Sequence, residues 1–218
     1  MPAARAQFRG LAAQRLRDNL ERVRDRIARA GGNPGSVEIC AATKYVPREE
    51  LPVLAEAGIA LVGENRAQDL VAAQELHGPE LFTWDFIGAL QSRKVRDVAP
   101  RVRLIHSVAS ESALRKLERD PAPEVLLEVN VSGEEGKAGI APAEIGEFAS
   151  RCPVPVSGLM TMPPLAERPE DSRPHFARLA ELAAEHGLDR LSMGTTQDFE
   201  AAVREGATLL RLGTVLYE

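Results

Sequence analysis

The stretch VEICAATKYVP, from Val37 to Pro47, decides the fold class. Residues 37–42 form an apolar, β-rich run that predicts a buried strand, and residues 43–47 follow it as a turn. An open dinucleotide-binding sheet carries a glycine-rich turn after its first strand, because the backbone must approach a pyrophosphate there. This turn contains no glycine, so the sequence argues against the open sheet.

Outward from this strand, the chain alternates between strand and helix patterns. Short apolar runs predict eight strands, at 37–42, 59–62, 83–87, 102–106, 124–131, 156–160, 190–193 and 208–212. Helical patterns lie between them at 48–57, 66–76, 92–98, 111–118, 143–150, 173–186 and 198–205. Several strands are apolar throughout, as strands buried on both faces are. Eight strands with seven intervening helices favour a closed (β/α)8 barrel, a TIM barrel, over a doubly wound sheet.

The region before the repeat, residues 1–31, predicts one long helix that ends at a pair of glycines. Its apolar positions recur at helical spacing: Leu11, Leu16, Leu20, Val23 and Ile27. No linker, low-complexity run or shift in composition divides the 218 residues. We therefore expect a single α/β domain over 1–218, without a C-terminal β-domain.

The composition excludes several classes of protein. A net charge of −5 argues against nucleic-acid binding by bulk electrostatics. Two cysteines, Cys40 and Cys152, are too few for a disulfide framework and are typical of free thiols in a reducing compartment. The sequence has neither a secretory apolar core nor a run of about 18 apolar residues that could cross a membrane. We expect a cytoplasmic protein that binds neither nucleic acid nor membranes.

The first chemical candidate is Lys44, two residues past the end of the first strand. A side chain there lies at the C-terminal rim of a barrel and points toward its mouth. Partial removal from water lowers the pKa of a lysine, because burial disfavours the ammonium form. The unprotonated amine can form a Schiff base with an aldehyde. The alternative is an exposed surface lysine without a chemical role.

A second group of small and polar residues follows the seventh and eighth strands, where barrels frequently bind phosphate. The group comprises Ser192, Gly194, Thr195, Thr196, Arg211, Gly213 and Thr214. Gly194 lets the backbone approach closely, the threonines supply hydroxyls, and Arg211 can add charge-assisted hydrogen bonds. The helix that begins near Asp198 offers free N–H groups to an anion. The compatible alternative is that Thr196 or Asp198 caps that helix and Gly213 is a turn residue.

In a closed barrel the eighth strand lies beside the first, so Lys44 and the phosphate-binding group face each other across the seam. A molecule that carries both an aldehyde and a phosphate would bridge them. Pyridoxal 5′-phosphate (PLP) is such a molecule, and we expect it as the cofactor, held as a Schiff base on Lys44.

Other candidates carry less information. Asn65, after the second strand, could hydrogen-bond the cofactor ring or cap the next helix. The four histidines show no metal-ligand spacing, and we expect no metal site. No Ser/His/Asp or paired-carboxylate arrangement stands out, so the sequence assigns no catalytic residue.

Several short motifs follow one another along the chain. They are Ala42-Thr43-Lys44, Gly63-Glu64-Asn65, Trp84-Asp85-Phe86-Ile87-Gly88 with Leu90-Gln91 and Lys94, Asn130-Val131-Ser132 with Lys137-Ala138-Gly139-Ile140, Gly158-Leu159-Met160, and Ser192-Met193-Gly194 with Arg211-Leu212-Gly213-Thr214. Together they resemble the pyridoxal phosphate homeostasis protein family over essentially the whole chain.

The resemblance implies a barrel related to the N-terminal domain of alanine racemase, with PLP on Lys44. It implies phosphate contacts from Thr195, Thr196, Arg211 and Gly213. It also implies that PLP is bound, buffered or delivered and is not used in a turnover reaction. The remaining cofactor-binding residues that we predict are Asn65, Met160, Ser192, Gly194 and Thr214.

Three positions depart from the family pattern. The family usually has serine at Ala42, which looks harmless, and commonly Met-Ser at Thr195-Thr196, where Thr196 keeps a hydroxyl for phosphate. It usually has histidine at Asp85, so any proton-relay role of that histidine is in doubt in this chain.

Three functions compete: a PLP carrier, a PLP-dependent amino-acid racemase, and an aldolase-like barrel enzyme. Racemisation requires a base on each face of the substrate adduct. The resembling racemases take their second base, a tyrosine, from a C-terminal β-domain, and this sequence would end before one could begin. Neither Tyr45 nor Tyr217 is an evident substitute. An aldolase would need a base and a second charged clamp, which the sequence does not reveal.

We therefore expect a PLP carrier without enzymatic turnover, with the racemase as the alternative. Apo forms of PLP-dependent enzymes are the expected recipients, although the sequence does not identify them. We expect a monomer or a weak homodimer.

Overall fold

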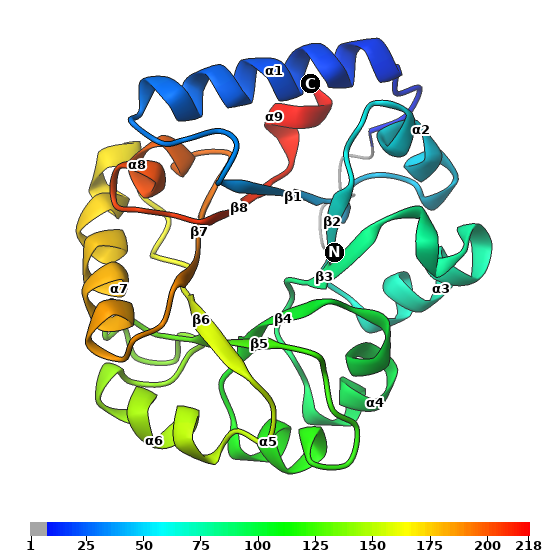
Figure 1. Ribbon diagram of the computed structural model, residues 1–218. Coiled ribbons are helices and arrows are strands. Elements are labelled where there is room, and N and C mark those ends of the chain that lie inside the picture. The colour runs from blue at the N-terminus through cyan, green and yellow to red at the C-terminus, as the bar shows by residue number, and fades with distance from the viewer. Residues whose placement is uncertain (1–7) are drawn as a thin grey trace.

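The structure is a computed structural model and describes residues 8–218. Eight parallel strands close into a barrel in the order β1 to β8 (Figure 1), which confirms the (β/α)8 prediction. The strands are β1 (Glu38–Ala42), β2 (Leu61–Glu64), β3 (Thr83–Phe86), β4 (Leu104–Val108), β5 (Val125–Glu128), β6 (Val156–Met160), β7 (Arg190–Thr195) and β8 (Leu209–Leu212). The barrel closes where β1 pairs with β8, with Ile39 opposite Leu210.

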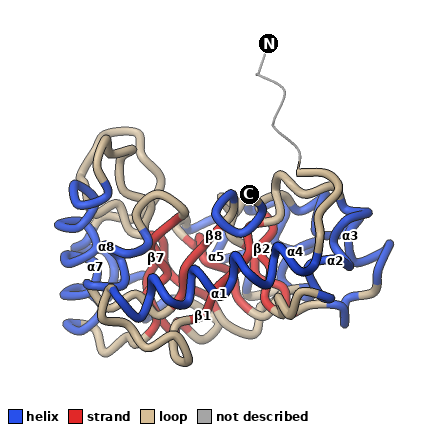
Figure 2. Tube along the Cα trace, turned by 90° about the horizontal axis from the view of Figure 1, so that it is seen from above, coloured by secondary structure: helices blue, strands red, loops and turns tan. Residues whose placement is uncertain are grey.

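The helices surround the strands (Figure 1). They are α1 (Ala13–Arg29), α2 (Leu51–Glu56), α3 (Ala67–His77), α4 (Val95–Val98), α5 (Glu111–Leu117), α6 (Ile145–Arg151), α7 (Arg173–Glu185), α8 (Phe199–Arg204) and α9 (Thr214–Tyr217). The views in Figures 1 and 2 place α1 across the β1–β8 side of the barrel, where it contacts α9. Within residues 8–218, no helix is both long and apolar enough to cross a membrane.

The N-terminal helix is shorter than predicted, because it begins at Ala13. The backbone N–H groups of Gly10 and Leu11 donate to the Glu50 carboxylate at 2.8 and 3.1 Å. Gly10 has a φ of +64°, which ends any helix before it. The first seven residues of the predicted helix lie outside the described residues. The short α9 was not predicted, since four residues give no helical periodicity.

Strand boundaries differ from the prediction in several places: β5 ends three residues earlier than expected, and β7 ends two residues later. β4 and β2 each begin and end two residues later than expected. The shift at β2 has a visible cause. Its residues Gly63 and Glu64 pair with Asp85 and Phe86 of β3. A glycine inside a strand resembles a turn in the sequence. At Gly63 it serves packing, because a Cβ there would lie 2.7 Å from the Cys40 sulfur.

The core has two compartments, which follow from the alternation of side chains along each strand. In β8, Leu210 and Leu212 pack outward against the helices, whereas Leu209 belongs to a small apolar cluster with Cys40, Leu104, Leu126 and Met160. Arg211 lies between the two leucines and is buried. The barrel interior is therefore partly polar above a small apolar layer.

Candidate functional site

A cavity of about 370 Å³ lies at the carboxyl ends of the strands around the β1–β8 seam. Its walls are formed by Ala42, Lys44, Tyr45, Asn65, Ile87, Gly88, Met162, Thr195, Thr196, Gln197, Arg211, Gly213 and Thr214. Most of the predicted site residues therefore meet in one cavity. Met160, Ser192 and Gly194 are buried and do not belong to its walls.

Lys44 stands at the rim, two residues past β1, with its Nζ 4.8 Å from the centre of the Tyr45 ring. The side chain is exposed, so the expected partial removal from water is wrong for this structure. The reason is local: β1 ends at Ala42, and Lys44 belongs to the loop that follows the strand. Lys44 also lines a second cavity of about 410 Å³, which lies between the loop after β1 and the start of α3.

Arg211 lines the 370 Å³ cavity at the β1–β8 seam, and three groups hold its guanidinium. Its NH1 donates to Ser192 Oγ at 2.6 Å. Its NH2 lies 2.9 Å from both the Thr161 carbonyl oxygen and the Met162 sulfur. Burial lowers the pKa of Arg211, although a guanidinium remains charged in proteins. The site thus contains a buried cation whose direction is fixed.

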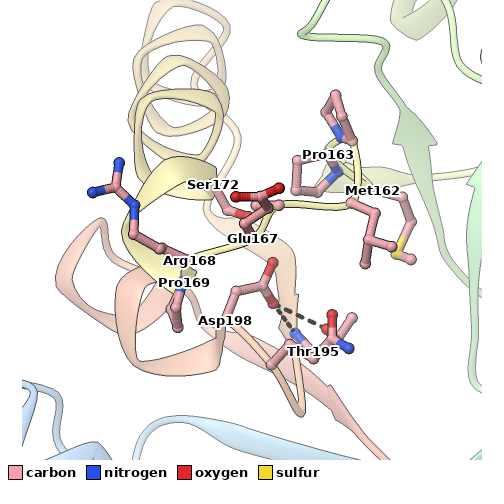
Figure 3. Close-up of a pocket in the computed structure, with 12 residues that line it drawn as sticks. Met162, Pro163, Glu167, Arg168, Pro169, Ser172, Thr195 and Asp198 are labelled. Carbon is pink, nitrogen blue, oxygen red and sulfur yellow. Dashed lines mark hydrogen bonds between the residues drawn. The ribbon is translucent and has the colours of Figure 1, made fainter.

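In the loop after β7, polar groups form hydrogen bonds with one another and with the loop after β8. Asp198 Oδ1 accepts from the backbone N–H of Thr195 at 2.7 Å and from its hydroxyl at 3.0 Å (Figure 3). The Gly213 N–H donates to Thr196 Oγ1 at 3.2 Å. Asp198 is the N-cap residue of α8, but its side chain makes no capping hydrogen bond there. Simple capping by Asp198 is therefore excluded.

Gly194 supports this loop from within. Its φ of +91° is a conformation that side chains rarely adopt, and a Cβ would lie 2.7 Å from that of Ala202. The backbone at Gly194 therefore does approach another part of the molecule closely, and that part is α8. Its close approach to a ligand stays a prediction.

Asn65 lines the cavity and carries a polar atom without a partner in the described part of the chain. Its Oδ1 is buried and has no hydrogen-bond partner among residues 8–218. The N-cap residue of α3 is Arg66, without a side-chain cap bond, so the alternative that Asn65 caps this helix is wrong. A contact with a cofactor ring stays a prediction.

Sequence reasoning missed several wall residues. Met162 follows β6 by two residues and also lines an adjacent cavity of about 540 Å³ beneath the loop 162–169 (Figure 3). Gly88 sits where a Cβ would lie 2.1 Å from the Asn65 carbonyl oxygen. A glycine directly after the third predicted strand was the available signal for this close approach. Nothing in the sequence distinguished Met162 from Met160.

Beneath Arg211, a row of buried polar side chains crosses the barrel. Asp85 pairs with Arg103 at 2.7 Å, and its Oδ2 lies 3.1 Å from His106 Nε2. His106 Nδ1 lies 2.9 Å from Ser192 Oγ. Burial raises the pKa of Asp85, but hydrogen bonds from His106 and Arg103 outweigh it and hold the pKa below its usual value. Burial lowers the pKa of His106.

Known proteins share this sequence and this fold. The family model for the alanine racemase N-terminal domain matches residues 11–218. The pyridoxal phosphate homeostasis protein of Aquifex aeolicus is 40% identical, over 94% of this chain and 97% of that protein. The one from Pseudomonas aeruginosa is 37% identical, over 90% of each.

Among solved structures, PipY of Synechococcus elongatus with PLP bound superposes with a TM-score of 0.78. It is 31% identical, and the match covers 93% of this chain and all of PipY. These similarities confirm the resemblance seen in the motifs. The chain therefore belongs to the pyridoxal phosphate homeostasis protein family, built on the barrel of the alanine racemase N-terminal domain.

Proposed function

We propose that this chain binds PLP and serves PLP homeostasis in the cytoplasm, holding the cofactor for buffering or for delivery to apo-enzymes. The observation that carries the proposal is the meeting of Lys44 and Arg211 in one cavity at the β1–β8 seam. An amine and a fixed guanidinium are the two groups that an aldehyde phosphate requires. The PLP-bound structure of PipY supports the same assignment.

The residues present fit the cofactor. PLP would supply an aldehyde, a pyridine ring and a phosphate. Lys44 would hold the aldehyde end as a Schiff base, Arg211 with Thr196 and Thr214 would hold the phosphate, and Asn65 would face the ring. The unpartnered Oδ1 of Asn65 is the strongest sign of fit, because a buried polar atom without a partner costs roughly 1–3 kcal/mol unless a ligand satisfies it.

We further propose that the chain performs no turnover reaction. A racemase needs a second base opposite the lysine. Tyr217 is a poor candidate, because its hydroxyl donates to the Ala42 carbonyl oxygen at 3.2 Å and burial raises its pKa. Tyr45 is adjacent to Lys44 and its ring lies against the same amine. The exposed rim position of Lys44 also favours exchange of the cofactor over a closed reaction chamber.

The test is a titration with PLP followed by absorbance. The wild type should gain a band near the visible edge that borohydride abolishes, with the label mapped to the peptide containing Lys44. Lys44→Ala should lose the band, whereas the exposed control Lys116→Ala should keep it. A wild-type protein that stays colourless would refute PLP binding. Appearance of D-alanine from L-alanine with the loaded protein would refute the absence of turnover.

Delivery is tested separately with an apo-enzyme and a scavenger that removes free PLP. Recovery of enzyme activity in the presence of the scavenger would indicate direct transfer. Recovery that the scavenger abolishes would limit the role of the chain to buffering.

A further inference from the structure

Met162 differs in its surroundings from the other two methionines among residues 8–218. Met160 and Met193 are buried at 2% and 0% exposure, whereas Met162 is 46% exposed. It begins the loop 162–169 (Figure 3) and lies in the walls of both the 370 Å³ cavity at the β1–β8 seam and the neighbouring 540 Å³ cavity. Solvent therefore reaches this side chain within the proposed cofactor site.

The sulfur of Met162 also contacts the buried cation of the site. Arg211 NH2 donates to Met162 Sδ at 2.9 Å. The same guanidinium donates to the Thr161 carbonyl oxygen at 2.9 Å and to Ser192 Oγ at 2.6 Å. A thioether sulfur is a weak acceptor, whereas carbonyl and hydroxyl oxygens are strong ones. Of these three hydrogen bonds, the one to Met162 is thus the easiest for an anionic ligand to replace.

Oxidation changes the chemistry of this contact. Hydrogen peroxide converts a thioether to a sulfoxide: a sulfur lone pair attacks one peroxide oxygen, the O–O bond breaks, and an S–O bond forms. The departing hydroxide takes the proton of the transferred oxygen and leaves as water. The sulfur loses the two electrons that the peroxide gains. The product is polar, and its oxygen is a stronger acceptor than the sulfur was.

We propose that Met162 is a site of reversible oxidation by peroxides, at which the sulfoxide oxygen accepts from Arg211 NH2 and thereby lowers the affinity of the site for PLP. The flexible Met162 side chain can turn the new oxygen toward the guanidinium. That oxygen then competes with the ligand for the same donor and occupies space in the cavity. The inference rests on the proposed function, since it places the PLP phosphate at Arg211.

The first measurement locates the oxidation. The cofactor-free protein is treated with hydrogen peroxide, the reaction is stopped with catalase, and each methionine is followed by the fragment masses of its peptide. Met162 should gain one oxygen at least about tenfold faster than Met160 and Met193, because both of these are buried. Bound PLP should slow the reaction at Met162, because the ligand covers this wall of the cavity.

The second measurement follows PLP affinity before and after oxidation, by absorbance titration. The affinity of the wild type should fall about tenfold, the effect of losing one hydrogen bond to a charged group. Methionine sulfoxide reductase should restore it, since this enzyme repairs methionine and leaves oxidised Cys40 or Cys152 unchanged. Met162→Gln places an amide oxygen beside Arg211 and should show a lowered affinity without peroxide.

Two further substitutions make the comparison specific to Met162. Met162→Leu has an apolar side chain of similar size that peroxide cannot oxidise, so its PLP affinity should be the same before and after treatment. The matched control is Met193→Leu, which removes a methionine from the buried core. On treatment it should lose PLP affinity as the wild type does.

The possible outcomes separate the two proposals. An untreated wild type that does not bind PLP overturns the proposed function and this inference with it. A wild type that binds PLP, and keeps its affinity after Met162 has been oxidised, overturns the inference alone. The inference also fails if the three methionines are oxidised at equal rates, if Met162→Leu loses affinity on treatment, or if PLP leaves the rate at Met162 unchanged.

Discussion

The two ends of the cavity are built differently. At the β8 end, Arg211 is buried and its guanidinium is held by Ser192, Thr161 and Met162. At the β1 end, Lys44 stands exposed at the rim, against the ring of Tyr45. A fixed cation can select a ligand, and an accessible amine can exchange it. The difference suggests that recognition and release are assigned to opposite ends of one site.

Two buried carboxylates repeat the contrast. Asp85, below Arg211, is paired with Arg103 and has a lowered pKa. Glu64, beside Lys44 in the second cavity, has a buried Oε2 without a hydrogen-bond partner in the described part of the chain. Burial raises the pKa of Glu64 to about 7. The arginine end is thus electrostatically satisfied and the lysine end is not.

The largest effect on stability should come from removing the buried Asp85–Arg103 ion pair. Asp85→Ala leaves the Arg103 charge without its buried partner and should lower the free energy of unfolding by about 3–5 kcal/mol. Urea denaturation measures this loss. In the half-exposed control Asp97→Ala, which loses two surface ion pairs, with Lys94 at 3.8 Å and with Arg96 at 3.5 Å, the change should stay below about 1 kcal/mol. Equal losses of unfolding free energy in the two variants would show that the buried pair stabilises the fold no more than a surface pair does.

Replacing Glu64 at the lysine end should instead raise stability, at a pH where its carboxyl group would lose its proton. Because the pKa of Glu64 is raised when folded, the folded state keeps a proton that the unfolded chain releases above about pH 4.5. Stability should therefore fall as the pH rises from 4.5 to about 7, by up to about 3 kcal/mol. Glu64→Gln can still accept from Thr43 and should lack this loss.

The measurement is the melting temperature of both proteins at pH 5 and pH 8. The variant should gain on the wild type only at the higher pH. Parallel curves would mean that Glu64 titrates normally.

A third comparison isolates the arginine end of the cavity. Arg211→Met replaces the guanidinium by an apolar chain and should weaken PLP binding by about 2 kcal/mol, roughly thirtyfold. Pyridoxal binding should change little, because it carries no phosphate. Arg115→Met, on the exposed face of α5, serves as the control. If both ligands weaken alike, Arg211 does not contact the phosphate.

The smallest effect should come from the hydrogen bond that joins Tyr217 of α9 to Ala42 of β1. Tyr217→Phe removes the hydrogen bond to the Ala42 carbonyl oxygen and should cost about 1 kcal/mol of stability. PLP binding should persist, since Tyr217 does not line the cavity. Loss of binding in a folded Tyr217→Phe protein would assign this hydroxyl a direct role in the site.

The barrel could be predicted because strands buried on both faces leave apolar runs, and eight of them alternate with helices. Lys44 and Arg211 were recognisable because each stands at or near a strand end. The buried row was not, since Asp85 and His106 come from the neighbouring strands β3 and β4 and meet Ser192 of β7 only across the closed barrel. Its signal was present as a charged or polar residue within each apolar run, such as Asp85 between Trp84 and Phe86.

The seam between β1 and β8 also sets the order of events during synthesis. Ala42 and Tyr217 lie 175 positions apart, yet they share a hydrogen bond beside the site. A growing chain displays its lysine early and lacks the arginine until the eighth strand emerges. Capture of the cofactor therefore waits for the last strand to dock on the first. A ligand that recognises only the closed ring then stabilises it by mass action, about 2.7 kcal/mol at a hundredfold excess over its dissociation constant.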